Sequence, residues 1–130
     1  MTWLTHLELG YNFNQPLGDS LSTLTRLTHL KFDLWFNQSL KTSLHNLKKL
    51  THLEFGYYFN QPLGDSLSTL TRLTHLTFGV HFDYHLETSL SELTQLTHLN
   101  LGGYYTKSLQ FSLSNLTNLT HLTFGHRNMW

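Results

Sequence analysis

Residues 50–72 read LTHLEFGYYFNQPLGDSLSTLTR, and this unit of 23 residues recurs along the chain without insertion. Its first four residues, Leu-Thr-His-Leu, start at Leu4, Leu27, Leu50, Leu73, Leu96 and Leu119. The repeats are residues 4–26, 27–49, 50–72, 73–95, 96–118 and the partial sixth, 119–130. A fixed period of about 20 to 50 residues is typical of solenoids, so we expect residues 1–130 to form one solenoid domain.

The amino-acid composition is dominated by leucine, as the repeat is, and it argues against several classes of protein. Of 130 residues, 30 are leucine, whereas alanine, isoleucine and cysteine are absent. Eight basic side chains balance eight acidic ones, which argues against nucleic acid or a membrane surface as the partner. A chain without cysteine has no disulfide framework and no thiol nucleophile.

Targeting signals are not found in the sequence. The N-terminal residues MTWLTH contain no basic segment followed by an apolar one, as a signal peptide would. No stretch approaches the roughly 18 apolar residues of a membrane-spanning helix. We therefore expect an intracellular, cytoplasmic protein, or one in the host cytoplasm if the source is a virus.

Numbering each repeat from its first leucine shows the expected local structure. Leu53 and Phe55, at positions 4 and 6, alternate with outward Glu54 and Gly56, which predicts a short strand with one buried face. Position 17 is always serine, a good N-cap, and few residues remain before the next strand, which favours a 3₁₀ or short helical turn. Leucine at positions 14, 18 and 21 completes the pattern. It predicts an α/β leucine-rich repeat solenoid with six short parallel strands and 3₁₀ or short helical returns.

The repeat resembles the FNIP-type leucine-rich repeats of giant DNA viruses of amoebae and of social amoebae. The residues that carry the resemblance are LTHL, the following Phe-Gly and the FNQP element, which stands intact at Phe13–Pro16 and Phe59–Pro62. The resemblance covers essentially the whole chain. It implies a protein-binding role without naming the partner.

Stacking turns each repeat position into a column of side chains. We expect the aromatic column at position 10, from Phe13 to Tyr105, to form a buried spine. We expect the column that begins with Asn14 to satisfy backbone groups in the turns.

Position 3 gives a column of six histidines: His6, His29, His52, His75, His98 and His121. Since position 4 faces inward, these imidazoles should face outward from the sheet. Two interpretations stay open: a stacked, hydrogen-bonded ladder with a structural role in the strands, or a ladder that binds Zn²⁺, Cu²⁺ or Ni²⁺ or responds to pH. Because neighbouring imidazolium groups repel, we expect stability to fall on acidification.

Positions 8 and 9, at the end of each strand, vary while the frame around them stays fixed. They include Tyr11, Trp35, Tyr57, Tyr58 and Tyr104. Tyrosine and tryptophan are enriched in interface hot spots, so this edge is a candidate protein-binding site together with the histidine column.

The ends of a solenoid expose apolar side chains and an unpaired strand edge unless something covers them. Trp3, Met129 and Trp130, together with Met1, could cover them as small caps or could anchor a second copy. We expect a homodimer, because a symmetric contact closes the assembly.

No arrangement of residues points to catalysis. Polar groups recur in columns of one type, whereas an active site needs different groups that converge in a pocket. We therefore expect a non-enzymatic protein without catalytic residues, metal or cofactor, whose partners are an unidentified protein and its own copy.

Overall fold

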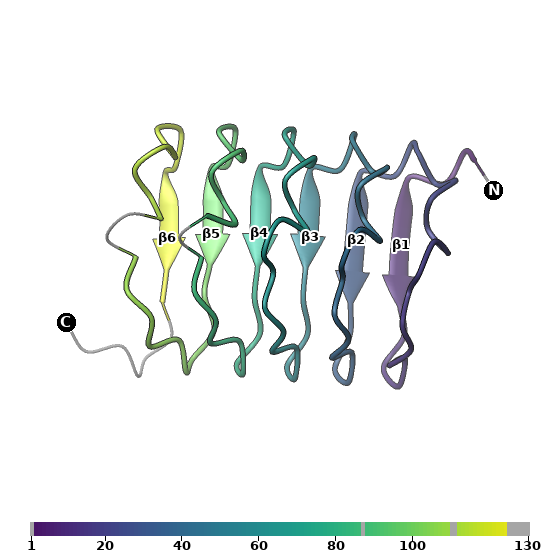
Figure 1. The fold of residues 1–130 in the computed structure, drawn as a ribbon, viewed down its shortest axis with the longest axis horizontal. Helices are drawn as coiled ribbons and strands as arrows, with labels where there is room; N and C mark the ends of the chain where they lie inside the picture. Colours follow the sequence, from purple (N-terminus) through teal and green to yellow (C-terminus); the bar gives the residue numbers. More distant parts are fainter. Residues whose placement is uncertain (1, 87, 110–111, 125–130) are drawn as a thin grey trace.

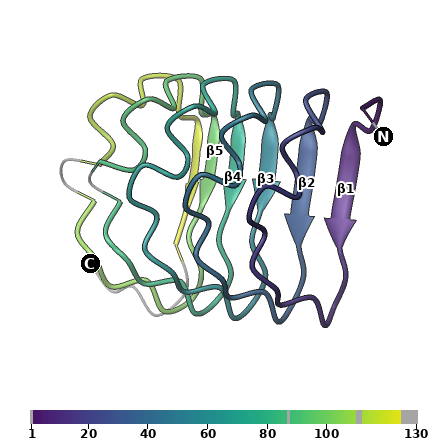
Figure 2. The ribbon, with the colours of Figure 1, turned by 45° about the vertical axis from the view of Figure 1, so that its right-hand side comes forward.

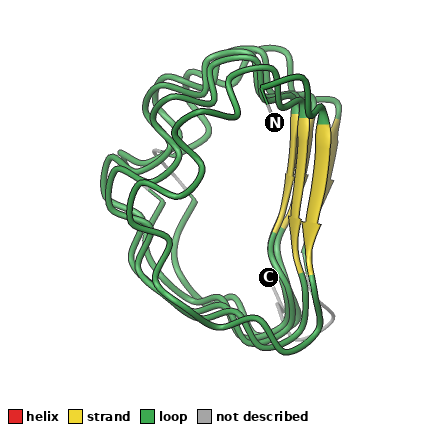
Figure 3. Cartoon of the chain, turned by 90° about the vertical axis from the view of Figure 1, so that its right-hand side faces the viewer, coloured by secondary structure: helices red, strands yellow, loops and turns green. Residues whose placement is uncertain are grey.

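The computed structural model describes residues 2–86, 88–109 and 112–124, and these form a parallel β-solenoid (Figure 1). Within them, six strands lie in chain order in one sheet. They are β1 His6–Leu9, β2 His29–Phe32, β3 His52–Glu54, β4 His75–Thr77, β5 His98–Asn100 and β6 His121–Thr123. Each repeat adds one strand and then travels round the solenoid, as the turned views show (Figures 2 and 3). The predicted solenoid of six short parallel strands is confirmed.

The register of the sheet follows the repeat. His6 pairs with His29, and His29 in turn pairs with His52. The same offset of one repeat holds through β6. Every repeat position therefore becomes a column of side chains, and the columns of like residues at the invariant positions form the core and the histidine face.

The core consists of leucine and phenylalanine columns behind the sheet. Leu30, Leu53 and Leu76 on the inner face are buried. The position-10 rings from Phe13 to Tyr105 stack at centroid distances of 6.0–6.1 Å, and those of Phe36, Phe59 and Phe82 are completely buried. The predicted aromatic spine therefore lies in the interior.

The asparagine column links the turns of neighbouring repeats. Asn37 donates its backbone N–H to Asn14 Oδ1 at 2.8 Å, and Asn60 does the same to Asn37 Oδ1 at 2.8 Å. Gln61 Nε2 adds a second bond to Asn37 Oδ1 at 3.1 Å. Each amide thus satisfies a backbone donor, as the sequence predicts.

The return segments differ from the predicted 3₁₀ or short helical turns, because none of the described residues is in a helix. The described residues therefore also contain no helix that could cross a membrane. The return contains separate turns, in which Ser43 N–H bonds to Leu40 O at 2.8 Å and Leu47 N–H to Leu44 O at 3.0 Å. A 3₁₀ helix needs such bonds at consecutive residues. Because the bonds around Ser43 are those of separate turns, Ser43 caps no helix.

Candidate interaction surface

The outer face of the sheet carries an uninterrupted stack of the six histidines. Neighbouring rings lie 4.1–4.2 Å apart between centroids, with planes inclined by 8–12°. The terminal rings of His6 and His121 are exposed, and those between them are partly buried. The structure brings the whole predicted column into one ladder.

A threonine hydroxyl at position 2 holds each imidazole. Thr51 Oγ1 lies 2.8 Å from His52 Nδ1, and its hydroxyl donates to Thr28 O at 3.1 Å. This pair of contacts recurs in every repeat from Thr28 to Thr120. The ring orientation is therefore fixed by the neighbouring repeat as well as by stacking.

The environment of the column disfavours the protonated imidazole. Desolvation by burial lowers the pKa of His29, His52 and His75 below the ordinary value of 6.5. Positive charge on other members of the column lowers these pKa values further. The middle of the ladder is therefore neutral at neutral pH, and protonation of one ring opposes that of the next.

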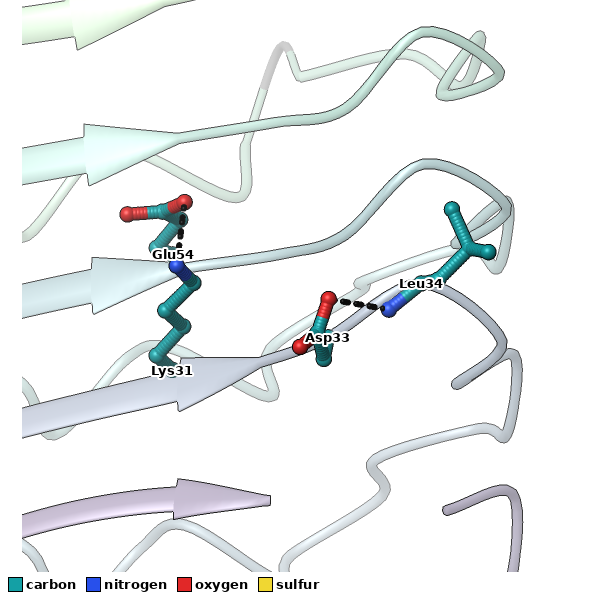
Figure 4. Close-up of polar contacts among 4 residues, drawn as sticks. All are labelled: Lys31, Asp33, Leu34 and Glu54. Atoms are coloured by element: carbon teal, nitrogen blue, oxygen red, sulfur yellow. Dashed lines mark hydrogen bonds and ion pairs between the residues drawn. The ribbon is translucent and has the colours of Figure 1, made fainter. Parts of the chain in front are cut away.

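A shallow hollow of about 440 Å³ lies on the sheet face over β1, β2 and β3. Its lining includes the first three histidines of the column and the position-5 side chains Glu8, Lys31 and Glu54. Lys31 Nζ lies 3.8 Å from Glu54 Oε2, and these side chains are 45% and 50% exposed (Figure 4). Water screens such an exposed pair, so it contributes little to stability. With neutral imidazoles, two carboxylates and one ammonium give the hollow a net negative charge.

A second feature, the aromatic edge, lies beyond the carboxyl ends of the strands. We define it by Tyr11, Trp35, Tyr57, Tyr58, His81 and Tyr104. The rings of Trp35 and Tyr58 stack at 4.5 Å with planes inclined by 12°, and His81 continues the row 5.0 Å from Tyr58. Tyr104 then meets His81 edge-on at 5.6 Å. Trp35, with 44% of its surface exposed, therefore presents an apolar ring that is already ordered by its neighbour.

The candidate end residues are only partly described. Trp3 lies in a turn before β1 with 70% of its surface exposed. Leu7 and Leu9 of β1 pack against the core but are only partly buried. Met129 and Trp130, like Met1, lie outside the described residues.

The histidine ladder does not form a convergent metal site. Across residues 2–86, 88–109 and 112–124, no group of three or more His, Asp or Glu side chains could hold a metal ion. Metal sites bring three or four ligands together at one ion. The histidine rings are stacked nearly parallel, so their nitrogens lie side by side in a row and do not converge on one ion.

Two features of this surface were not among the site residues predicted from the sequence. His81 belongs to the aromatic edge, and the signal for it was its place at position 9, which Trp35 and Tyr58 also hold. The position-2 threonines are the second feature, and they recur as regularly as the histidines beside them. Their bonding role follows only from the sheet register, because each hydroxyl reaches the preceding repeat.

Two solved leucine-rich repeat structures share this architecture. A circular leucine-rich repeat protein of a giant virus, CroV588, superimposes with a TM-score of 0.78 and 35% identity over 95% of this chain and 17% of its own. An internalin, InlF of Listeria monocytogenes, gives a TM-score of 0.77 and 26% identity over 95% of this chain and 35% of its own. The chain therefore spans well under two thirds of either protein. No protein-family model and no curated protein matches the sequence.

Proposed function

We propose that this chain, which has the leucine-rich repeat fold, is a non-enzymatic protein-binding scaffold that uses the histidine face and the aromatic edge. The exposed, stacked rings of the aromatic edge carry this proposal. Tyrosine and tryptophan give large contact areas at interfaces, and rings that are ordered before binding lose little conformational entropy. The shared fold supports the general role of a protein-interaction scaffold.

We also propose that the repeats are of the FNIP type and that the chain associates with itself as a homodimer. The intact FNQP elements, whose asparagines link the turns, support the first proposal. The aromatic edge and the exposed Trp3 support the second, because both offer apolar surface to another copy.

The mass of the protein in solution tests the proposed interface. We expect light scattering after size-exclusion chromatography to give twice the chain mass for the wild type. The variant Trp35→Ser/Tyr58→Ser should give the mass of one chain, with its circular dichroism spectrum unchanged. Tyr84→Ser is the matched control, because Tyr84 is an exposed tyrosine outside the aromatic edge. A dimer that persists in the double variant would exclude this edge as its interface.

A pH-responsive surface is the second candidate function, and the lowered pKa values in the middle of the histidine column favour it. Acidification would convert the neutral face into a cationic one over a broad range of pH, because protonation of one ring opposes that of the next. A partner that binds the neutral face would then be released.

A further inference from the structure

The threonine at position 2 determines which imidazole nitrogen carries hydrogen. A hydroxyl has one hydrogen, and the contact of Thr51 Oγ1 with Thr28 O at 3.1 Å has the geometry of a donated bond, to a carbonyl that also accepts the backbone N–H groups of Thr51 and His52. With this hydrogen engaged, Thr51 Oγ1 can only accept a hydrogen bond from His52. His52 Nδ1 therefore carries the hydrogen in the neutral ring, and Nε2 is left as an acceptor.

The Nε2 atoms of the column have no hydrogen-bond partner within the described part of the chain. The contacts of these rings are the threonine bonds at Nδ1 and the stacking of one ring on the next. In the hollow over β1–β3, three such acceptors lie beside the carboxylates of Glu8 and Glu54. The hollow is therefore rich in acceptors and negative in charge, and Lys31 is its one cation.

We infer that this hollow binds an arginine side chain of a protein partner. The inference rests on the proposed protein-binding function and specifies the chemistry of the partner. A guanidinium is planar and carries five N–H donors, so it can donate to neighbouring imidazoles about 4 Å apart and to a carboxylate at once. A lysine ammonium is a compact, strongly hydrated charge that matches such a row less well.

The histidine column extends over all six strands, but the proposed arginine site does not. Over β4–β6 the position-5 residues are Thr77, Asn100 and Thr123, so the carboxylates of the hollow have no counterpart there. The arginine preference therefore belongs to the first three strands. It should disappear when the imidazoles are protonated, because they then carry positive charge and no acceptor beside Lys31.

Titration with short blocked peptides tests the inference directly. We expect Gly-Arg-Gly to shift the imidazole NMR signals of His29 and His52 at about pH 7.5, and Gly-Lys-Gly to bind at least threefold more weakly. Glu54→Gln should weaken the arginine peptide about threefold, the effect of one exposed charge pair. Glu92→Gln, an exposed glutamate on a return segment, is the matched control and should change nothing.

A second variant separates the acceptor row from simple charge attraction. Thr51→Val keeps every charge but removes the hydroxyl that holds the hydrogen on His52 Nδ1. We expect it to weaken the arginine peptide while circular dichroism remains native. Equal binding of the arginine and lysine peptides, or no binding of either, would overturn the inference. The proposed function would still be tested separately by the dimer and its Trp35→Ser/Tyr58→Ser variant.

Discussion

Glycine at position 7 allows neighbouring repeats to approach closely just after the strands. A Cβ at Gly79 would collide with the backbone carbonyl of Gly56, and one at Gly56 would collide with that of Asp33. Gly10, in the first repeat, has open space around the same position. The glycine is therefore a packing requirement in repeats three to five, whereas repeat two holds Asp33 at this position.

Gly79→Ala should consequently destabilise the fold by about 1–3 kcal/mol, because the backbone must shift to relieve the collision. Gly10→Ala should change the free energy of unfolding by less than about 0.5 kcal/mol. Urea unfolding of both variants checks this difference. Equal stabilities would contradict the close approach between repeats three and four.

Lys41 occupies a strained backbone conformation on the return of repeat two. Its φ of 50° lies in the left-handed region, where the equivalent positions of repeats one and three hold Gly18 (φ 54°) and Gly64 (φ 52°). Lys41→Gly should remove this strain and stabilise the protein by about 1 kcal/mol. The reciprocal Gly64→Lys should destabilise it by a similar amount. Thermal unfolding measures both changes, and a loss of stability in Lys41→Gly would be inconsistent with strain at this residue.

At the scale of the elements, the asparagine ladder ties one turn to the next. Asn37→Ala would leave the backbone N–H of Asn60 without its acceptor, while Gln61 Nε2 would keep only its bond to the backbone carbonyl of Asn37. We expect a loss of about 1–3 kcal/mol, the cost of a partly buried polar group left unpaired. Asn12→Ala, at an exposed position of the aromatic edge turn, serves as the control. Similar melting temperatures for the two variants would mean that the ladder adds no stability.

The elements could be predicted from the sequence to different extents. Alternation around Leu53 and the fixed period were sufficient for the strands, their register and the buried spine, because stacking leaves few alternatives. The predicted helical returns are not confirmed, since the spacing of leucines after Ser43 suits a helical turn and a string of separate turns equally well. The left-handed backbone of Lys41 could not be anticipated, because lysine rarely adopts it.

The side chains that form the columns of the candidate site could be predicted from the sequence. The contacts between repeats that give the site its chemical properties could not. The histidine ladder and most of the aromatic edge follow from residue positions in the repeat. The hollow over β1–β3 depends on contacts between repeats, such as that of Lys31 with Glu54, which need the sheet register. The position-2 hydroxyl bonds depend on the same register.

At the scale of the whole molecule, the histidine column links stability to pH. The pKa values of His29, His52 and His75 are lower in the folded chain than the ordinary value of 6.5. Below that value the unfolded chain binds more protons than the folded one, so acidification favours unfolding. Above pH 6.5 these three histidines are mostly neutral in both states and do not lower the free energy of unfolding. As the pH falls below that value, the free energy of unfolding decreases.

The melting temperature should therefore be lower at about pH 5 than at about pH 7.5. His52→Gln should reduce the difference, because it removes the ring that interacts with the most neighbours in the column. His45→Gln, on a return segment outside the column, is the control. A melting temperature that stays constant across this range would rule out the linkage.

The tautomer of the histidine column is the property on which the account of this surface depends most. Long-range ¹H–¹⁵N NMR correlation spectra at a pH of about 8, where the rings are neutral, distinguish a ring hydrogen on Nδ1 from one on Nε2. We predict the Nδ1–H pattern for His29, His52, His75 and His98, with a bare Nε2 on the outer face. Spectra with the hydrogen on Nε2 would mean that the threonine hydroxyls donate to Nδ1, and the face would then present donors where we propose acceptors.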